Sequence, residues 1–292
     1  MGRALVRELA TEHTLVGVDT VPGPESCSSI QGDLADPSVL RAAFAHGCDA
    51  VIHLATVPGG AAELNPRLAK QINVDASMAL IDAAAAAGRR PRFIFASSIA
   101  VFGDPLPASV DDSTPVAPRL VYGAHKAMLE TWIASQSRRA AIDGVSLRLP
   151  GIIARPRGPS GMKSAFMSEV FHALKRGERF ISPVSPAATM WLMSVRQLGE
   201  NIRHALTVNP AWWPEQRAIT LPALRVTMAD LASEIRGACA SDPTLLGYAP
   251  DAALEAAFGS LPPLQTACAD RLGFIHDQSL AQLVRSGLST LQ

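Results

Sequence analysis

The chain has 292 residues, of which 48% are hydrophobic and 18% charged, a composition that excludes a disordered or fibrous protein. Its formal net charge is zero, so composition favours neither nucleic acid nor an anionic membrane as a partner. The four cysteines lack metal-ligand spacing, and no apolar run approaches the about 20 residues that span a bilayer. We therefore expect a cytoplasmic protein with reduced thiols and no bound metal.

Short β-branched runs alternate with alanine-rich segments, which is typical of a doubly wound parallel sheet with helices on both faces. The expected strands, in chain order, are 14–19, 29–32, 49–55, 92–97, 144–149 and 217–221. The expected helices between them are 2–10, 37–45, 64–87 and 121–140. Pro115 and Pro118 keep the chain non-helical just before Tyr122, which places that tyrosine in a first helical turn.

The pattern changes after Leu149, because residues 150–161 contain three prolines and three glycines. This run predicts a loop that leaves the sheet to build a smaller C-terminal substrate-binding lobe. We expect residues 1–150 to form the first domain, with 190–225 returning to it. The lobe then comprises 151–189 and 226–292.

Tyr122 and Lys126 are four residues apart, so on a helix they share one face. A fixed ammonium favours the phenolate, whose reference pKa is about 10. Ser98 ends the preceding expected strand, and its hydroxyl could hold a substrate oxygen while Tyr122 moves a proton. Such residues are general acid–base apparatus for oxidising an alcohol or reducing a carbonyl. Taken alone, the pair is also compatible with a half-buried tyrosine beside a solvated lysine.

Other residues end the expected strands on the side where doubly wound sheets bind dinucleotides. Asp19 is placed to accept hydrogen bonds from an adenosine ribose and to repel a 2′-phosphate, which selects NAD over NADP; the alternative is an ordinary turn aspartate. Asp33 could bond the adenine amino group while Leu34 packs on the ring. We expect His53 to be a core histidine, and we expect the Asn73 amide to hydrogen-bond to neighbouring backbone groups.

These segments, in this order, resemble the extended short-chain dehydrogenase/reductase family, the NAD-dependent epimerase/dehydratase group. The resemblance covers nearly the whole chain and rests on Asp19, Gly32-Asp33-Leu34, His53-Leu54-Ala55, Asn73-Val74-Asp75, the run 95–103 and the run 122–126. It implies a Rossmann-like fold, NAD as cofactor, and a homodimer through helices 64–87 and 121–140. Ser98 is then the catalytic hydroxyl, Tyr122 the proton carrier, and Lys126 the residue that holds the nicotinamide ribose and lowers the Tyr122 pKa.

The resemblance also implies two sets of binding residues. The cofactor set is Gly2, Asp19, Asp33, Leu34, Leu54, Ala55, Asn73, Tyr122, Lys126 and Pro150. The substrate set is Thr56, Ser98, Ile99, Tyr122, Arg155, Lys163 and Trp191.

One departure from the family concerns the substrate. Nucleotide-sugar epimerases carry an asparagine after the next strand, but Gly151 stands at the matching position here. The runs 148–156 and 182–194 are similar to the D-erythronate dehydrogenase branch, whose members oxidise a four-carbon sugar acid at C2 to a 2-keto acid. Arg155, Arg157 or Lys163 could neutralise its carboxylate, although each also reads as a solvated loop cation.

A second departure concerns the start of the chain. Family members open with a buried strand and a Gly-x-x-Gly-x-x-Gly turn, whereas residues 1–10 resemble only the end of that motif, with Gly2 as the third glycine. The first strand and two glycines are then absent from the expected sheet. This leaves open an incomplete start, which the intact catalytic residues favour, or a truncated product with an impaired cofactor site.

Three functions follow as hypotheses. The leading one is NAD-dependent oxidation of a D-erythronate-like 2-hydroxy acid to its keto acid. The first alternative is a nucleotide-sugar epimerase or dehydratase that recycles NAD within one turnover. The second is a non-catalytic homologue that retains only the fold.

Overall fold

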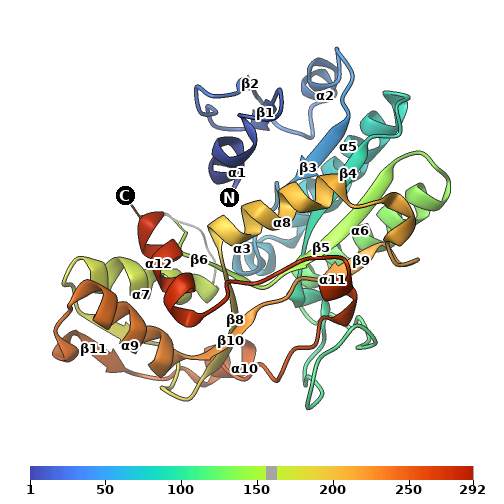
Figure 1. The fold of residues 1–292 in the computed structure, drawn as a ribbon. Coiled ribbons are helices and arrows are strands. Elements are labelled where there is room, and N and C mark those ends of the chain that lie inside the picture. The colour runs from blue at the N-terminus through green and yellow to red at the C-terminus, as the bar shows by residue number, and fades with distance from the viewer. Residues whose placement is uncertain (156–162, 292) are drawn as a thin grey trace. The chain divides into compact units, whose positions relative to one another are not determined.

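The structure is a computed structural model that describes residues 1–155 and 163–291 (Figure 1). The strands are β1 (Val16–Asp19), β2 (Ser28–Gln31), β3 (Ala50–His53), β4 (Arg92–Ser98), β5 (Asp143–Leu149), β6 (Gly151–Ile153), β7 (Phe180–Ser182), β8 (Thr189–Ser194), β9 (Ala218–Thr220), β10 (Leu224–Thr227) and β11 (Leu246–Tyr248). The α-helices are α1 (Gly2–Leu9), α2 (Pro37–Ala43), α3 (Gly59–Leu64), α4 (Pro66–Lys70), α5 (Ala76–Ala86), α6 (Val121–Arg138), α7 (Phe166–Lys175), α8 (Val195–Thr207), α9 (Met228–Cys239), α10 (Ala252–Phe258), α11 (Ala267–Arg271) and α12 (Leu280–Ser289). Single turns are η1 (Gln71–Asp75), η2 (Ile99–Val101), η3 (Lys163–Ala165), η4 (Pro210–Trp212) and η5 (Pro243–Leu245).

The chain divides into two compact units. The first comprises Met1–Asp104, Pro115–Leu149 and Gly199–Thr220, and the second comprises Pro105–Thr114, Pro150–Leu198 and Leu221–Gln292. The segment 190–225, expected to belong to the first domain, is therefore longer than the segment Gly199–Thr220 that the first unit contains. Residues 190–198 stay in the second unit because β8 pairs there with β6 and β10.

The first unit contains two parallel sheets. Strands β3, β4, β5 and β9 form one sheet in the order β3-β4-β5-β9, and β1 pairs with β2 in the other. The β4–β5 ladder is the longest, running in register from Arg92↔Asp143 to Ser98↔Leu149. Within the described residues the two sheets share no ladder. The six strands predicted from the sequence are all present, which confirms a parallel α/β fold.

Helices α5 and α6 cover one face of the four-stranded sheet. Phe93 and Phe95 alternate along β4 and both contribute to the core with Leu129 and Ile133 of α6. Every residue of β5 is buried, as expected for a parallel strand covered on both faces. This core holds the carboxyl end of β4 against α6, the region where the catalytic residues are predicted.

The predicted helix 64–87 is wrong as a single element. It is divided into the end of α3, then α4, a π-helical turn η1 and α5. Asn65 starts α4 by accepting the backbone N–H of Leu68 at 3.1 Å, and Pro66 occupies its first turn. An N-cap and a first-turn proline together begin a new helix, which is why alanine content alone misplaced the boundary.

A buried ion cluster ties the amino ends of β4 and β5 to the chain before β9. The Asp143 carboxylate pairs with Arg92 Nε at 2.9 Å and with an Arg217 guanidinium nitrogen at 2.7 Å. Arg92 also donates to the carbonyls of Ala205 and Val208 at 2.9 and 2.7 Å. The cluster lies at the edge of the sheet opposite to Ser98, so its role is to hold strands and α8 together.

The second unit contains a mixed sheet in the order β10-β8-β6 and a parallel pair of β7 and β11. Helices α7, α9 and α12 pack on each other around an apolar core that includes Phe171, Leu192 and Ile235. Residues 105–114 join this unit because Val110 donates its N–H to the Pro263 carbonyl at 3.0 Å.

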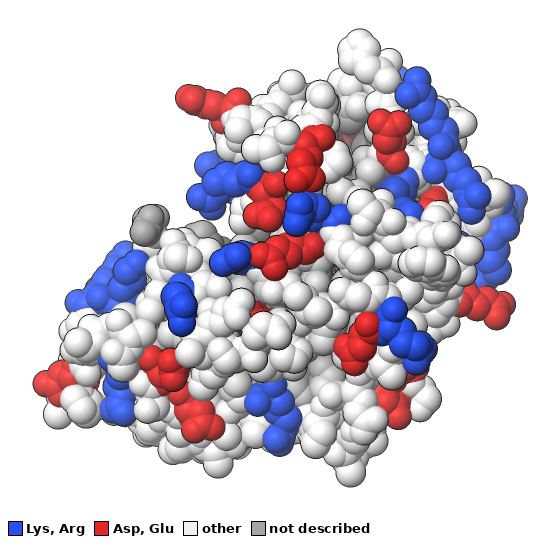
Figure 2. All heavy atoms as spheres, viewed as in Figure 1, with Lys and Arg blue, Asp and Glu red and all other residues white. Residues whose placement is uncertain are grey.

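Charged side chains of both signs lie interspersed on the face shown in Figure 2. In the part of the chain that the structure describes, no helix combines the length and apolar character that a bilayer crossing requires.

Candidate active site

Ser98 lies at the carboxyl end of β4, where the extended chain turns into η2. Its backbone is still extended, and its Oγ accepts the Ala100 N–H at 3.1 Å, which caps that turn. The side chain is half-buried. Because one lone pair is used by the cap, the hydroxyl hydrogen is available to donate to a substrate oxygen.

Tyr122 lies in the first turn of α6, as predicted, and Lys126 lies one turn later. The Glu63 carboxylate accepts the Val121 N–H at 2.7 Å and so caps the start of this helix. Lys126 Nζ is 5.4 Å from the centroid of the Tyr122 ring. The helix therefore places the phenol and the ammonium on one face, as their spacing indicated.

Gly123 is a site residue that the sequence reasoning missed. A Cβ at this position would lie 2.1 Å from the Ala100 carbonyl oxygen. The first turn of α6 can therefore contact the segment that follows Ser98 only because residue 123 has no side chain. A glycine inside a helix costs about 1 kcal/mol relative to alanine, and this unfavourable choice was the available signal.

Lys126 is almost fully enclosed, with only 2% of its surface exposed. Its Nζ donates to the Ala96 carbonyl at 2.7 Å and lies 4.4 Å from the centroid of the Phe95 ring. Burial lowers the pKa of Lys126 to about 7, and the negative charge of Glu130 acts in the opposite direction. The ammonium form therefore depends on the balance between desolvation and a neighbouring carboxylate.

His53 is a core histidine, which confirms the interpretation from sequence. It is buried, its Nε2 lies 2.7 Å from Ser77 Oγ, and it stacks on Phe95 with 5.6 Å between ring centroids. Burial, followed by the charge of Lys126, lowers the pKa of His53 to about 3. The ring is neutral at physiological pH and has no role as a proton donor.

Asn73 pins the loop after β3, as predicted for its amide. Its Oδ1 accepts the Val57 N–H at 2.6 Å and the Thr56 hydroxyl at 3.1 Å, while its Nδ2 donates to the Val57 carbonyl at 2.9 Å. Asn73 is buried in the π-helical turn η1, a type of irregularity often found at functional sites. Asn73 therefore fixes the position of this loop and of Thr56.

The predicted adenosine-side residues lie on exposed strand ends of the first unit. Asp19 is exposed at the end of β1, and its Oδ1 accepts the Val21 N–H at 3.3 Å. Asp33 uses one oxygen to accept the Ala35 N–H at 2.9 Å, and Leu34 is half-buried against the core. Within the described residues, Asp19 forms no ion pair.

The remaining predicted cofactor residues lie at the start of α1 and just after β3. Ala55 is exposed just beyond β3, and Leu54 is half-buried. Gly2 begins α1, where an added Cβ would meet only Leu54 Cδ1, at 4.0 Å. An exposed carboxylate at the end of β1 and open backbone at α1 and after β3 fit a dinucleotide.

The predicted substrate residues of the second unit differ in their exposure to solvent. Arg155 is half-buried, and its N–H donates to Ser168 Oγ at 3.1 Å. Lys163 is exposed at the start of η3, and Ile99, a predicted substrate residue of the first unit, is half-buried. Pro150, which was predicted in the cofactor set, is buried. Arg157 lies outside the described residues.

Trp191, for which a substrate contact was predicted, is buried. Trp191 lies on the central strand β8, has 1% of its surface exposed, and donates its indole N–H to the Pro262 carbonyl at 2.7 Å. Its side chain has neither surface nor a donor left for a ligand.

Gly151 begins β6 next to Trp191. A Cβ at Gly151 would lie 3.0 Å from the Trp191 carbonyl oxygen and 3.0 Å from Leu192 Cδ2. An asparagine does not fit this backbone without displacement of its neighbours. Among the described residues, no group of three or more His, Cys, Asp or Glu side chains is placed to hold a metal ion.

Comparison with known proteins gives three findings. The pattern of the "NAD dependent epimerase/dehydratase family" matches residues 1–200. A D-erythronate dehydrogenase of Cupriavidus necator is 35% identical over 261 residues, which cover 88% of this chain and 80% of the relative. A D-erythronate dehydrogenase of Haemophilus influenzae is 34% identical over 203 residues, covering 70% of this chain and 64% of that protein.

Among solved structures, a nucleoside-diphosphate-sugar epimerase from Agrobacterium tumefaciens is similar with a TM-score of 0.89. It is 26% identical, and the match covers 99% of this chain and 90% of that one. This similarity confirms the Rossmann-like fold expected from the sequence.

Proposed function

The chain belongs to the NAD dependent epimerase/dehydratase family, and from this premise we propose that it oxidises a D-erythronate-like 2-hydroxy acid to its 2-keto acid with NAD. It is a dehydrogenase of the extended short-chain type that uses a nicotinamide cofactor. The observation that carries the proposal is the arrangement of Tyr122 and Lys126 on one face of α6, next to the turn that Ser98 caps.

In the proposed reaction, Ser98 donates a hydrogen bond to the substrate hydroxyl oxygen and orients it. The Tyr122 phenolate would take the hydroxyl proton as the carbon–hydrogen bond breaks. A nicotinamide held by the cofactor residues would supply the two-electron acceptor for the hydride. Lys126 stabilises the phenolate by its positive charge. The products are the keto acid, the reduced cofactor and one proton.

Asp19, Asp33, Leu34, Leu54, Ala55 and Gly2 are the residues that we assign to the cofactor. The exposed Asp19 carboxylate at the end of β1 supports NAD over NADP, because a 2′-phosphate there meets a like charge. Asn73 and Thr56 contribute through the loop that they form together.

A small acid is supported as substrate by two observations. The relatives that are 35% and 34% identical are both named D-erythronate dehydrogenase. Gly151 stands where the epimerases carry the asparagine that serves nucleotide sugars, and a Cβ there would lie 3.0 Å from the Trp191 carbonyl oxygen, so that its neighbours would have to shift. We assign the substrate carboxylate to Arg155 or Lys163, whose charges suit it.

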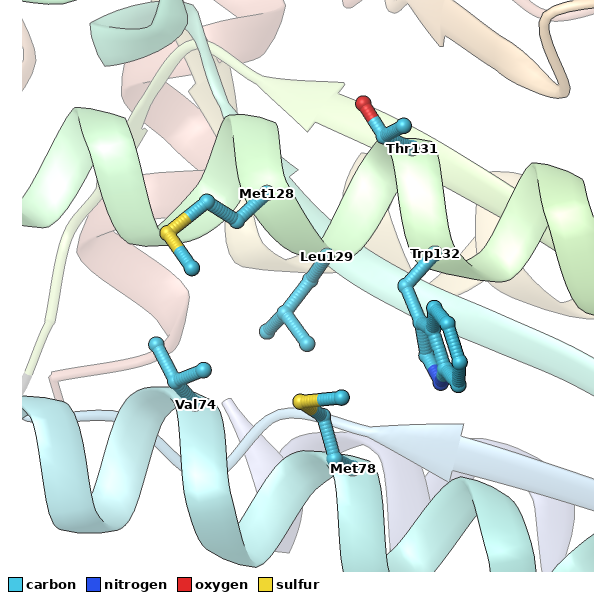
Figure 3. Close-up of a pocket in the computed structure, with 6 residues that line it drawn as sticks. All are labelled: Val74, Met78, Met128, Leu129, Thr131 and Trp132. Atoms are coloured by element: carbon cyan, nitrogen blue, oxygen red, sulfur yellow. The ribbon is translucent and has the colours of Figure 1, made fainter.

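We further propose a homodimer. Figure 3 shows side chains of η1 and α5 pointing toward side chains of α6 across a groove of about 330 Å³. Met128 on this groove is 54% exposed. An exposed apolar side chain at an apolar groove between helices is typical of an association site. The change Met128→Glu should yield a monomer in light scattering, whereas Trp212→Glu, at another exposed apolar residue, should not.

A cytoplasmic location is the remaining proposal. The four cysteines are all free thiols, which suits a reducing compartment.

The test is nicotinamide reduction by the purified full chain, given NAD and D-erythronate or related 2-hydroxy acids. We expect NADH to accumulate and Tyr122→Phe to lower kcat by about 10²–10⁴-fold, the usual contribution of a general acid–base group. Tyr248→Phe is the matched control, because Tyr248 is the other tyrosine of the chain and belongs to the second unit.

Two outcomes would contradict the proposal. Conversion of a nucleotide sugar without net NADH would identify an epimerase that recycles its cofactor. No NAD binding in calorimetry and no change of any activity in Tyr122→Phe would identify a non-catalytic homologue.

A further inference from the structure

A buried polar cluster lies directly behind the catalytic residues. Glu130 has 5% of its surface exposed, and its Oε1 accepts the Ser97 hydroxyl at 2.5 Å. Arg148 of β5 donates to both carboxylate oxygens, from Nε at 3.0 Å and from a terminal nitrogen at 2.8 Å. The Arg148 guanidinium also lies 5.3 Å from the centroid of the Phe102 ring. Glu130 is thus held in one position by side chains of two strands.

This cluster adjoins the proposed site along both β4 and α6. On β4, two consecutive residues bond to α6: the Ala96 carbonyl accepts from Lys126 Nζ, and the Ser97 hydroxyl donates to Glu130. The next residue, Ser98, caps η2. On α6, Lys126 and Glu130 are four residues apart and share a face. A displacement of Glu130 therefore moves the ends of two elements that carry catalytic residues.

Charge gives Glu130 a second connection to the site. Lys126 is enclosed by Phe95 and Ala96 of β4, His53 of β3 and its own helix, and desolvation disfavours its ammonium. His53 is neutral. Arg148 is paired with Glu130, so its charge is compensated locally. Glu130 is the group whose charge raises the pKa of Lys126 against burial.

We propose that Glu130 is a positioning residue of the dehydrogenase site, which clamps the end of β4 to the face of α6 and places a negative charge one helical turn from Lys126. Arg148 orients the Glu130 carboxylate, and Ser97 ties it to the residue next to Ser98. This role rests on the proposed function, because the charge of Lys126 matters for catalysis only if Tyr122 transfers a proton.

The test uses the fact that the chain has only 4 lysines. Nuclear magnetic resonance of the protein with isotope-labelled lysine side chains, with Lys126→Met to identify the signal, reports ionisation of Lys126 without substrate or cofactor. Because the negative charge of Glu130 favours the ammonium, Glu130→Gln should move this titration to lower pH by about one unit.

Two matched variants separate the charge from the clamp. Ser97→Ala removes one hydrogen bond but keeps the Glu130–Arg148 pair, and Glu130→Asp keeps the charge. Both should titrate with the parent. In an active preparation, the alkaline limit of kcat/KM should move to lower pH for Glu130→Gln and stay in place for Ser97→Ala.

The proposal is overturned if Glu130→Gln titrates with the parent, or if Ser97→Ala shifts the titration as far as Glu130→Gln does. Should Glu130→Gln fail to fold, the double change Glu130→Gln with Arg148→Gln removes both charges and allows the same titration. The titration needs the protein alone. The titration can therefore be interpreted even if the protein does not oxidise the proposed substrate. Conversely, a titration without a shift would contradict the role of Glu130 but not the proposed activity.

Discussion

Replacement of Gly123 by alanine tests how closely α6 must approach the segment after Ser98. An ordinary contact of a Cβ begins at 3.4 Å, and the Ala100 carbonyl oxygen would lie at 2.1 Å, so 3.4 minus 2.1 leaves a deficit of about 1.3 Å. The obstructing atoms are backbone, and Pro118 Cβ closes the site at 3.0 Å. The helix start must therefore move away from η2, and Tyr122 moves with it.

The expected loss is large because geometry near the reacting atoms is sensitive to displacements of this size. A misplacement of about 1 Å can lower the rate by about 10²-fold, which corresponds to about 2.7 kcal/mol in the activation free energy. Overpacking adds about 1–3 kcal/mol of lost folding stability. We expect Gly123→Ala to reduce kcat/KM by about 10²-fold and to lower Tm.

Steady-state kinetics and thermal unfolding measure the two effects. The matched control is Gly237→Ala in α9, where an added Cβ meets no atom within 4 Å. That change should leave activity unchanged and raise stability by up to about 1 kcal/mol, since alanine is the better helix former. Parental activity in Gly123→Ala would refute the inferred close approach.

Three further changes test other parts of the molecule. Asp143→Asn leaves its two arginine partners uncompensated and should cost about 3 kcal/mol in denaturant unfolding, whereas Asp75→Asn, in an ion pair that is more than half exposed, should cost less than about 1 kcal/mol. Lys126→Met should be more stable than the parent, most of all below pH 7. The folded-state pKa of Lys126, about 7, lies below the ordinary lysine value of 10.5, so the buried charge that destabilises the parent is fully present only below pH 7. That advantage should shrink between pH 7 and 10.5; a pH-independent difference in Tm would contradict it. Asp19→Asn should raise kcat/KM for NADP relative to NAD, and an unchanged cofactor ratio would place the selecting charge elsewhere.

The spacing of residues along the chain predicted correctly those features that depend on neighbouring residues only. Tyr122 and Lys126 share a face because helical geometry relates residues four apart, and the prolines before them set the start of α6. Asp19 ends β1 as the β-branched run indicated. The amide of Asn73 pins backbone because an asparagine inside a helix needs such a use. The substrate contacts of Arg155 and Lys163 stay predictions.

Alanine content and motif position gave poorer predictions for features that depend on helix caps or on tertiary packing. The segment 64–87 reads as one helix, but Asn65, Pro66 and the π-helical turn divide it. Trp191 was predicted to contact the substrate, but in the structure its indole is buried and donates to the Pro262 carbonyl.

By itself the sequence determined the six strands of the first unit and the helix face that Tyr122 and Lys126 share, because these depend on periodicity and spacing within a few residues. The family followed from the resemblance of its motifs. Tertiary structure alone decided that Ser97 and Arg148, 33 and 18 residues from Glu130 in sequence, meet on its carboxylate. It also decided that Gly123 lies against Ala100. Burial and pairing of charges depend on which strands become neighbours, and that is a property of the packed sheet that no local pattern of residues contains.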